Sequence, residues 1–294
     1  MKHAALFILF LLLLSWLSGC AVHTSADIAA TTLPVYTFTQ ALCNGTPLTV
    51  TRLITENVSC LHDYTLQVGQ MQAIQGASTV VISGAGLEEF LEDALSNADS
   101  VIDASHGLSL IQGEHHNHAH EHEHSGHVHE EDPHIWLSPE NAKLMASNIC
   151  EGLSREFPQY SSVFEANLTV LLRQLDDLQH YGEETLANLA CRELVTFHDG
   201  FSYLAESFDL TILEAVEEES GSEASAAQLI ELCRLLESHS LPAIFTETNG
   251  STSAANIISA ETGVKVFSLD MVMSGDDYFS IMYRNIDTLK EALQ

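Results

Sequence analysis

Basic residues are scarce in this sequence. Its 294 residues include 10 Lys and Arg but 41 Asp and Glu, which gives a formal net charge of −31 at pH 7. The phosphates of nucleic acids and the headgroups of anionic lipids repel a chain of this charge. We therefore expect no nucleic-acid partner and no direct adhesion to anionic lipid. The charge suits a protein that attracts cations, although a solvated acidic surface accounts for most of these carboxylates.

Long apolar runs are missing after the first nineteen residues. That opening segment carries a positive charge at Lys2 and continues with the apolar stretch AALFILFLLLLSWL. This stretch is too short and too close to the terminus to be a good membrane-spanning helix. It ends in LSGC, which is similar to a bacterial lipobox, and the alternative is an ordinary signal peptide before a chance cysteine. We expect residues 1–19 to be a lipoprotein signal peptide and Cys20 to carry the lipid. The mature protein would then be anchored outside the cytoplasm.

Cysteine is sparse and widely spaced. Five cysteines remain after Cys20 and none forms a CxxC pair, so the sequence has no zinc-ribbon signal. Disulfides are allowed outside the cytoplasm, but an odd number of cysteines leaves at least one thiol free. The sequence leaves the pairing open among Cys43, Cys60, Cys150, Cys191 and Cys233.

Strand-like and helix-like segments alternate along most of the chain. Runs such as Leu48–Val58 and Thr79–Ser83 read as strands and are separated by helical stretches, which is typical of βαβ units and of a mostly parallel sheet. From about residue 159 to 189, apolar residues recur at helical spacing without a proline, which predicts an unusually long helix. The expected fold is α/β, with two lobes joined by this helix. Each lobe would be a mostly parallel sheet flanked by helices.

The expected domain organisation follows from this pattern. After the signal peptide, residues 20–158 form an N-terminal α/β lobe, 159–189 form the linking helix, and 190–294 form a C-terminal α/β lobe. A histidine-rich loop, 114–130, interrupts the N-terminal lobe. Its histidines alternate with Glu, Asn, Ala, Ser and Gly, so the loop has no apolar period and nothing to bury.

We expect this loop to bind metal weakly, and the alternative is a tolerated insertion with incidental metal binding. The candidate auxiliary ligands are His115, His116, His118, His120, His122, His124, His127 and His129.

Four other metal-capable residues lie at or near the ends of expected strands, where open α/β sheets bind their ligands. His62 follows the strand Leu48–Val58, His198 follows ELVTF, and Asp270 follows VKVFSL. His134 lies between the histidine-rich loop and the start of a helix. Two of the four come from each half of the chain, so they can converge between the lobes. Three neutral imidazoles and one carboxylate suit zinc.

Several segments spread over the chain carry a family resemblance. They are LHDYTLQVGQMQAIQGASTVVISGAGLEEFLEDAL, DPHIWLSPENAKLMASNI, VTFHDGFSYLAESFDL, SEASAAQLIEL, and LD followed by DDYFSIMYRNIDTLKEAL. Together they resemble the solute-binding lipoproteins of ABC importers for zinc and manganese, over essentially the whole mature chain. In that family the metal ligands fall at His62, His134, His198 and Asp270. Manganese members usually carry Glu at the third position, so His198 and the histidine-rich loop favour the zinc members.

The first ligand motif departs from the family pattern. Cys and Leu precede His62, where the family commonly has Asp and Pro, and Thr-Leu stands where Glu-Pro is expected shortly after it. The loop around His62 would therefore differ in shape, which makes this ligand less certain than His134 or His198.

The resemblance implies the extracytoplasmic zinc-binding component of an ABC importer. Such a protein captures Zn²⁺ between its lobes and delivers it to a membrane permease. The implied partners are the permease, its ATPase and, through the lipid anchor, the membrane of a bacterial cell envelope. We expect a monomer. Within the family, the alternative is a manganese-binding homologue with Mn²⁺ as its cargo.

Two other classes of protein remain as alternatives. An extracellular zinc buffer or an adhesin would fit the histidine-rich loop alone. A zinc-dependent hydrolase also holds its metal with three protein ligands and leaves one position to water. Against a hydrolase, the sequence has no HExxH motif and no Ser or Cys nucleophile elbow. Asp270 would also fill the position that a catalytic water needs, so we expect no enzymatic activity.

Overall fold

The computed structural model describes residues 26–56, 58, 61, 64–112, 131–217, 225–275 and 277–294. The predictions for the signal peptide, Cys20, His62 and the eight histidines of the loop lie outside these residues.

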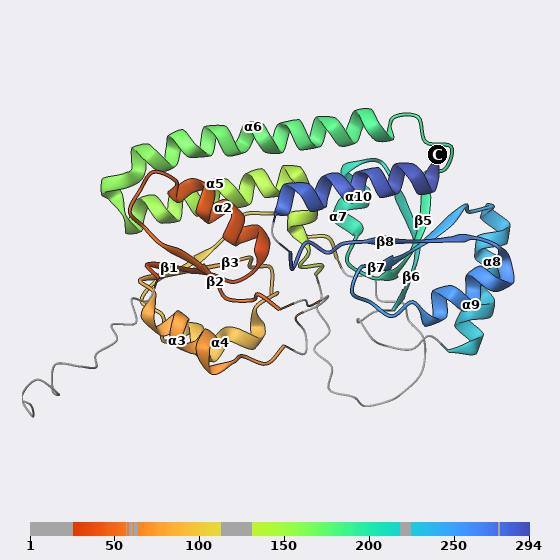
Figure 1. Ribbon diagram of the computed structural model, residues 1–294, viewed down its shortest axis with the longest axis horizontal. Coiled ribbons are helices and arrows are strands. Elements are labelled where there is room, and N and C mark those ends of the chain that lie inside the picture. Colours follow the sequence, from red (N-terminus) through yellow and green to blue (C-terminus); the bar gives the residue numbers. More distant parts are fainter. Residues whose placement is uncertain are drawn as a thin grey trace, which may run out of the picture.

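Two parallel sheets of four strands each form the cores of two lobes (Figure 1). The strand order is β2-β1-β3-β4 in the first sheet and β6-β5-β7-β8 in the second, and every pair is parallel. The first sheet consists of Ile28–Ala30 (β1), Val50–Arg52 (β2), Thr79–Ile82 (β3) and Val101–Asp103 (β4). The second consists of Glu193–His198 (β5), Thr211–Glu217 (β6), Ala243–Glu247 (β7) and Lys265–Leu269 (β8). In the second sheet the strand order reverses between β5 and β7, which is where open α/β sheets bind ligands.

Helices flank both sheets, as the sequence pattern predicts. In the N-terminal half they are Leu33–Cys43 (α2), Val68–Gly76 (α3), Glu92–Leu95 (α4) and Pro139–Glu156 (α5). After the linking helix Ser161–Leu186 (α6) come Ser202–Ser207 (α7), Ala226–His239 (α8), Ser253–Thr262 (α9) and Tyr278–Leu293 (α10). Short 3-10 turns occupy Glu89–Leu91, Ile135–Leu137 and Pro158–Tyr160. Within the described ranges, no helix is both long and apolar enough for a membrane span.

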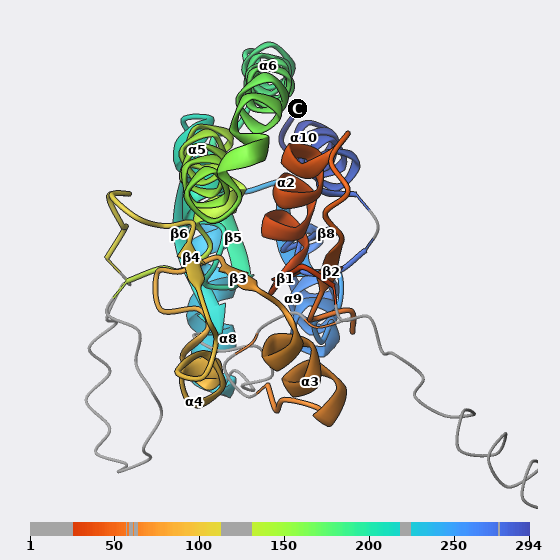
Figure 2. The same ribbon diagram turned by 90° about the vertical axis from the view of Figure 1, so that its left-hand side faces the viewer.

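The long helix α6 joins the lobes. It runs along both of them in Figure 1, and Figure 2 shows it lying over α5, α2 and α10. Its buried face includes Phe164, Leu171, Leu175 and Leu178, which recur at helical spacing. The predicted fold class, two parallel-sheet lobes flanked by helices and joined by one long helix, is confirmed. The exact domain boundaries stay a prediction.

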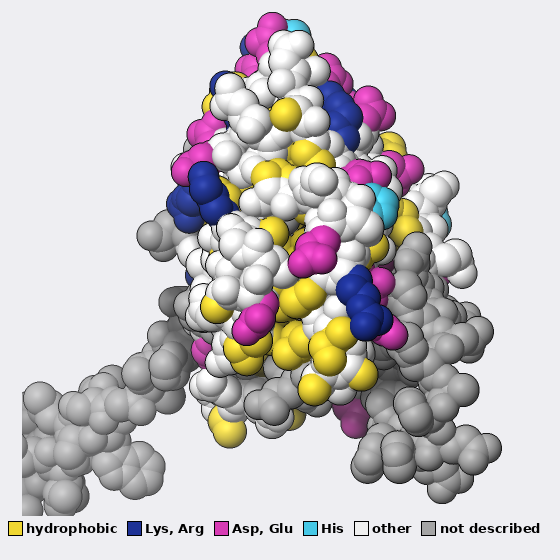
Figure 3. All heavy atoms as spheres, turned by 90° about the vertical axis from the view of Figure 1, so that its right-hand side faces the viewer, with side chains coloured by type: hydrophobic (Ala, Val, Ile, Leu, Met, Phe, Trp, Pro, Cys, Tyr) yellow, Lys and Arg dark blue, Asp and Glu magenta, His cyan; other side chains and the backbone are white. Residues whose placement is uncertain are grey.

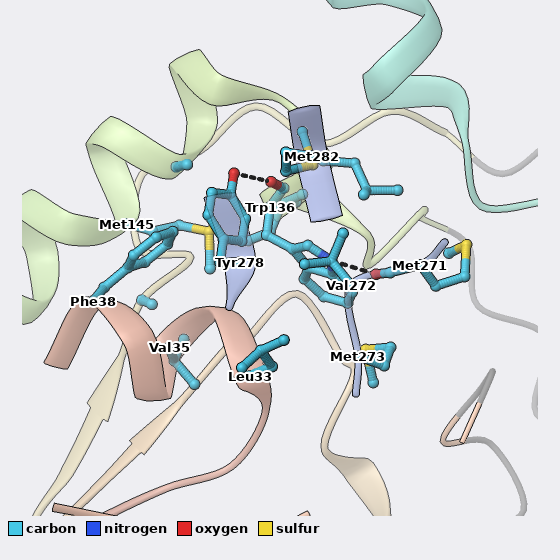
Figure 4. Close-up of a cluster of buried hydrophobic side chains, with 14 of the residues drawn as sticks. Leu33, Val35, Phe38, Trp136, Met145, Met271, Val272, Met273, Tyr278 and Met282 are labelled. Atoms are coloured by element: carbon cyan, nitrogen blue, oxygen red, sulfur yellow. Dashed lines mark hydrogen bonds between the residues drawn. The ribbon is translucent and has the colours of Figure 1, made fainter. Parts of the chain in front are cut away.

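A second stretch of chain crosses between the lobes. It starts after β8 and leads into α10, which begins beside α2 of the N-terminal lobe and ends in the C-terminal lobe (Figures 1 and 2). Tyr278, the first residue of α10, is fully buried and packs edge-on against Phe38 of α2, with 5.0 Å between the ring centroids. One continuous hydrophobic core therefore extends through both lobes (Figure 4).

A smaller core lies under α8 and α9 at the outer end of the C-terminal lobe. Figure 3 shows this end of the molecule, where apolar side chains gather between acidic and basic ones. Among the exposed large apolar side chains are Ile230 on α8 and Ile257 on α9, both of which are 54% exposed.

One strand prediction is wrong in its extent. The run Leu48–Val58 was expected to be a single strand, but β2 ends at Arg52. Leu53 and Ile54 are buried nonetheless, and their backbone N–H groups donate to the carbonyls of Ala30 and Thr31 at the end of β1. Their apolar character reflects burial at the edge of the sheet, which resembles a strand pattern in the sequence.

The four cysteines that the structure describes, Cys43, Cys150, Cys191 and Cys233, are free thiols.

Candidate metal centre

The chain segment around His134 fixes the position of its imidazole. It precedes the 3-10 turn Ile135–Leu137, and α5 then begins at Pro139 with Ser138 as its N-cap. The Oδ1 atom of Asp132 lies 2.9 Å from the backbone nitrogen of His134 and 2.8 Å from its Nδ1. A carboxylate accepts hydrogen bonds, so it favours the tautomer with the proton on Nδ1. The Nε2 atom then keeps a lone pair for a metal ion.

His198 has a similar partner in the other lobe. It is the last residue of β5, and its Nδ1 lies 3.1 Å from Oε1 of Glu247, the last residue of the adjacent strand β7. Both side chains are almost completely buried. The carboxylate again faces Nδ1, which leaves Nε2 as the atom available to a metal.

The two imidazoles meet between the lobes. Their ring centroids are 5.3 Å apart and their planes are inclined by 82°. A Cβ atom at Gly200 would lie 2.9 Å from Cε1 of His134 and 2.8 Å from Cδ2 of His198. Both of these carbons are bonded to Nε2, so the metal-binding edges of the two rings converge over Gly200. A side chain at this position would push the rings away.

Asp270 lies at the end of β8, as the sequence predicts, and its backbone is firmly held. Its N–H donates to the side chain of Asn285, whose amide group donates back to the Asp270 carbonyl, at 2.9 and 2.7 Å. Its Oδ1 accepts the N–H of Val272 at 2.8 Å. Burial raises the pKa of the Asp270 carboxyl, although this N–H and the nearby Arg284 act in the opposite direction. A partly desolvated carboxylate of this kind is stabilised by a nearby cation.

A small pocket connects Asp270 with the partner of His198. Its lining residues are Val58, Glu247, Thr248, Asn249, Asp270 and Met271. Val58 belongs to the N-terminal lobe and the other lining residues belong to the C-terminal lobe, so the pocket is lined from both lobes.

The structure thus brings His134 and His198 together and places Asp270 in a pocket beside Glu247. In the part of the chain that the structure describes, no three His, Cys, Asp or Glu side chains form a group that could hold a metal ion. His62 lies outside that part, so the complete set of four ligands stays a prediction. Two other histidines pair with surface carboxylates. His180 contacts Glu184 at 3.2 Å and His239 contacts Glu193 at 2.9 Å.

Two functional candidates were missed in the sequence. Glu247 ends a strand, so the rule that pointed to His198 and Asp270 could also have found it. Asp132 stands two residues before His134 in a loop, where no periodicity marks it. Only the folded backbone shows that its carboxylate turns back onto the imidazole.

An aromatic brace, which we define as Trp136 and Tyr278, joins the chain segments that carry two of the predicted ligands, His134 and Asp270. The indole Nε1 of Trp136 donates to the carbonyl of Met271, which follows Asp270, and the Tyr278 hydroxyl donates to the carbonyl of Trp136, both at 2.8 Å (Figure 4). Both side chains are fully buried. The segment after Asp270 is therefore fixed to the segment that carries His134.

The structure combines two parallel-sheet lobes, a long linking helix, and buried imidazoles between the lobes that are each paired with a carboxylate. These are the features of a two-lobed solute-binding protein. The family model described as "Zinc-uptake complex component A periplasmic" matches residues 28–292. The chain belongs to this family, which confirms the resemblance to zinc importer lipoproteins.

Relatives and solved structures agree with this membership. The zinc-binding lipoprotein AdcA of Streptococcus pneumoniae R6 is 31% identical over 293 residues, which cover 94% of this chain and 58% of the relative. The chain thus spans little more than half of that relative. A crystal structure of ZnuA has 28% identity and a TM-score of 0.79, and the match covers 92% of this chain and 100% of that one. The Zn(II)-bound AdcA structure from S. pneumoniae has 29% identity and a TM-score of 0.75, with 92% and 58% covered.

Proposed function

We propose that this protein is the extracytoplasmic zinc-binding component of an ABC importer. It binds one Zn²⁺ ion between its lobes and delivers the ion to a membrane permease. The observation that carries this proposal is the convergence of two buried imidazoles from the two lobes, each with a carboxylate on Nδ1. Paired carboxylates of this kind orient metal-binding histidines and make them better ligands.

The proposed ligands are His62, His134, His198 and Asp270. Asp270 supplies the carboxylate of the set. Burial raises the pKa of this carboxyl, and a bound cation would stabilise its ionised form. Nitrogen ligands in this number favour zinc over manganese, which prefers more oxygen ligands. The names of the relatives also specify zinc. Because Asp270 takes the position that a catalytic zinc site leaves to water, we assign the protein no catalytic reaction.

The proposed surroundings follow from the sequence and the family. Residues 1–19 are removed as a signal peptide, and Cys20 carries the lipid that anchors the protein to the membrane of a bacterial cell envelope. The partners are the permease and its ATPase, and the protein acts as a monomer. The loop 114–130 binds additional zinc weakly and raises its local concentration. The sequence of the loop has no apolar period with which to pack, so each ion that its histidines order would cost conformational entropy, whereas folding has already fixed His134.

Zinc titration of the metal-free mature protein, in competition with a chromophoric chelator, tests the proposal. We expect one tightly bound zinc ion, which is released as the pH falls through about 6 to 5, because protons compete for imidazoles with a reference pKa near 6.5. His198→Ala should lower the affinity strongly. His239→Ala is the matched control, since His239 pairs with Glu193 on the surface. Equal losses in the two variants would refute the assignment.

A further inference from the structure

Tyr203 links the two lobes close to the metal centre. It lies on α7 of the C-terminal lobe and is 3% exposed. Its hydroxyl accepts the backbone N–H of Ile111 at 2.9 Å and donates to the backbone carbonyl of Asp132 at 3.1 Å. Burial raises the pKa of Tyr203 to about 12, so the phenol keeps its proton and makes both hydrogen bonds at physiological pH.

The two backbone segments that the hydroxyl contacts are also joined to each other. The N–H of Asp132 donates to the carbonyl of Ile111 at 2.9 Å, and Gln112 pairs with Glu131 in an antiparallel bridge. These contacts all lie within the N-terminal lobe. The Tyr203 hydroxyl fixes this paired segment relative to the other lobe.

The same residues form a closed path through the metal centre. Asp132 binds the ring and the backbone of His134 through its side chain. Tyr203 belongs to the first turn of α7, which begins shortly after His198 at the end of β5. The path therefore runs from His134 through Asp132 and Tyr203 to His198, and the contact between the two imidazole rings closes it.

We propose that Tyr203 is a positioning residue of the zinc centre. Its hydroxyl holds Asp132, and through it the imidazole of His134, at the separation from His198 that a single zinc ion requires. This inference rests on the function proposed above. Tyr203 does not touch the metal, and it acts through the orientation of His134.

Tyr203→Phe removes the hydroxyl and keeps the ring in the core. Outer groups that orient metal ligands typically change metal affinity by about 10- to 100-fold. Tyr203 acts on the ligand His134 only through Asp132. We therefore expect a loss of about 10-fold in zinc affinity, mainly as faster release of zinc to a chelator. The visible absorption of the Co²⁺-loaded protein should also change, since it reports the geometry of the ligands. A purely structural role would leave this spectrum unaltered.

Tyr181→Phe is the matched control. The Tyr181 hydroxyl binds Asp287 at 2.6 Å and joins α6 to α10. This variant should keep the wild-type zinc affinity and Co²⁺ spectrum. Equal losses in Tyr181→Phe and Tyr203→Phe would overturn the proposal, as would a wild-type affinity and spectrum in Tyr203→Phe.

A third comparison places Tyr203→Phe in a His134→Ala background. Without the imidazole to position, the second substitution should cause little further loss of zinc affinity. If the two substitutions instead lower the zinc affinity by independent factors that multiply in the double variant, the proposal is overturned. If His134→Ala itself binds zinc like the wild type, the proposed function fails as well. Normal zinc binding with an inert Tyr203→Phe would refute only the role of Tyr203.

Discussion

The carboxylate of Asp132 provides a direct test of how the metal centre is organised. In Asp132→Asn the amide oxygen can still accept both hydrogen bonds that Oδ1 receives from His134, so the local fold should survive. The substitution removes the negative charge of the carboxylate. A hydrogen bond to a charged group contributes about 1.5–3 kcal/mol, against about 0.5–1.5 kcal/mol for a neutral pair. The difference of roughly 1–1.5 kcal/mol corresponds to a loss of about 10-fold in zinc affinity.

Asp132→Asn should also destabilise the fold. The Oδ2 atom of Asp132 is buried and has no hydrogen-bond partner among the described residues, and the substitution replaces it with an NH₂ group that needs acceptors. An unsatisfied buried donor costs about 1–3 kcal/mol. Thermal unfolding of the metal-free protein should therefore show a lower Tm than for the wild type.

The assay is a competition titration with zinc, with Asp176→Asn as the control. Asp176 is exposed on α6, where it pairs with Lys143 at 2.7 Å, and exposed pairs contribute little. Its substitution should leave zinc affinity unchanged. Wild-type affinity in Asp132→Asn, or an equal loss in Asp176→Asn, would refute the orienting role of the carboxylate.

Three further predictions concern the cargo, the loop and pH. His198→Glu should narrow the preference for zinc over manganese, because it replaces a nitrogen ligand with oxygen; manganese displacing equimolar zinc from the native protein would contradict the reasoning. Deletion of 114–130 should remove the weak calorimetric phase and leave one tightly bound zinc; loss of the tight phase would mean that the loop supplies a ligand. Burial raises the pKa of Glu88 from 4.5 to about 7, so its contribution to stability is present below about pH 4.5 and lost as the pH rises through 7. Between pH 5 and 8, the free energy of unfolding in urea should fall for the wild type relative to Glu88→Gln. The same pH dependence in both proteins would contradict this prediction.

Much of the fold could be predicted because local signals agree with the tertiary structure. Ser138 and Pro139 mark the start of α5, and the apolar period without proline predicts α6. The strand Leu48–Val58 was overextended because buried apolar residues beyond the end of a strand look like a strand in the sequence. The buried side chains of Leu53 and Ile54 continue the apolar pattern past Arg52, where β2 ends.

The candidate site was predictable only in part. The strand-end rule finds His198 and Asp270, and the structure shows that His198 meets His134. The contacts of Asp132 and Tyr203 depend on how two lobes pack and on where a loop turns back, which no local pattern encodes. Such contacts become visible only in three dimensions.

Anomalous diffraction at the zinc absorption edge, from crystals of the zinc-loaded protein, would locate the bound ion and its ligands. We expect one strong peak between the lobes, about 2.0–2.1 Å from Nε2 of both His134 and His198, with His62 and Asp270 completing the tetrahedron. The Nδ1 atoms should remain on Asp132 and Glu247. A principal zinc ion held by the histidines of loop 114–130, or bound through Nδ1 of either imidazole, would refute the proposed metal centre.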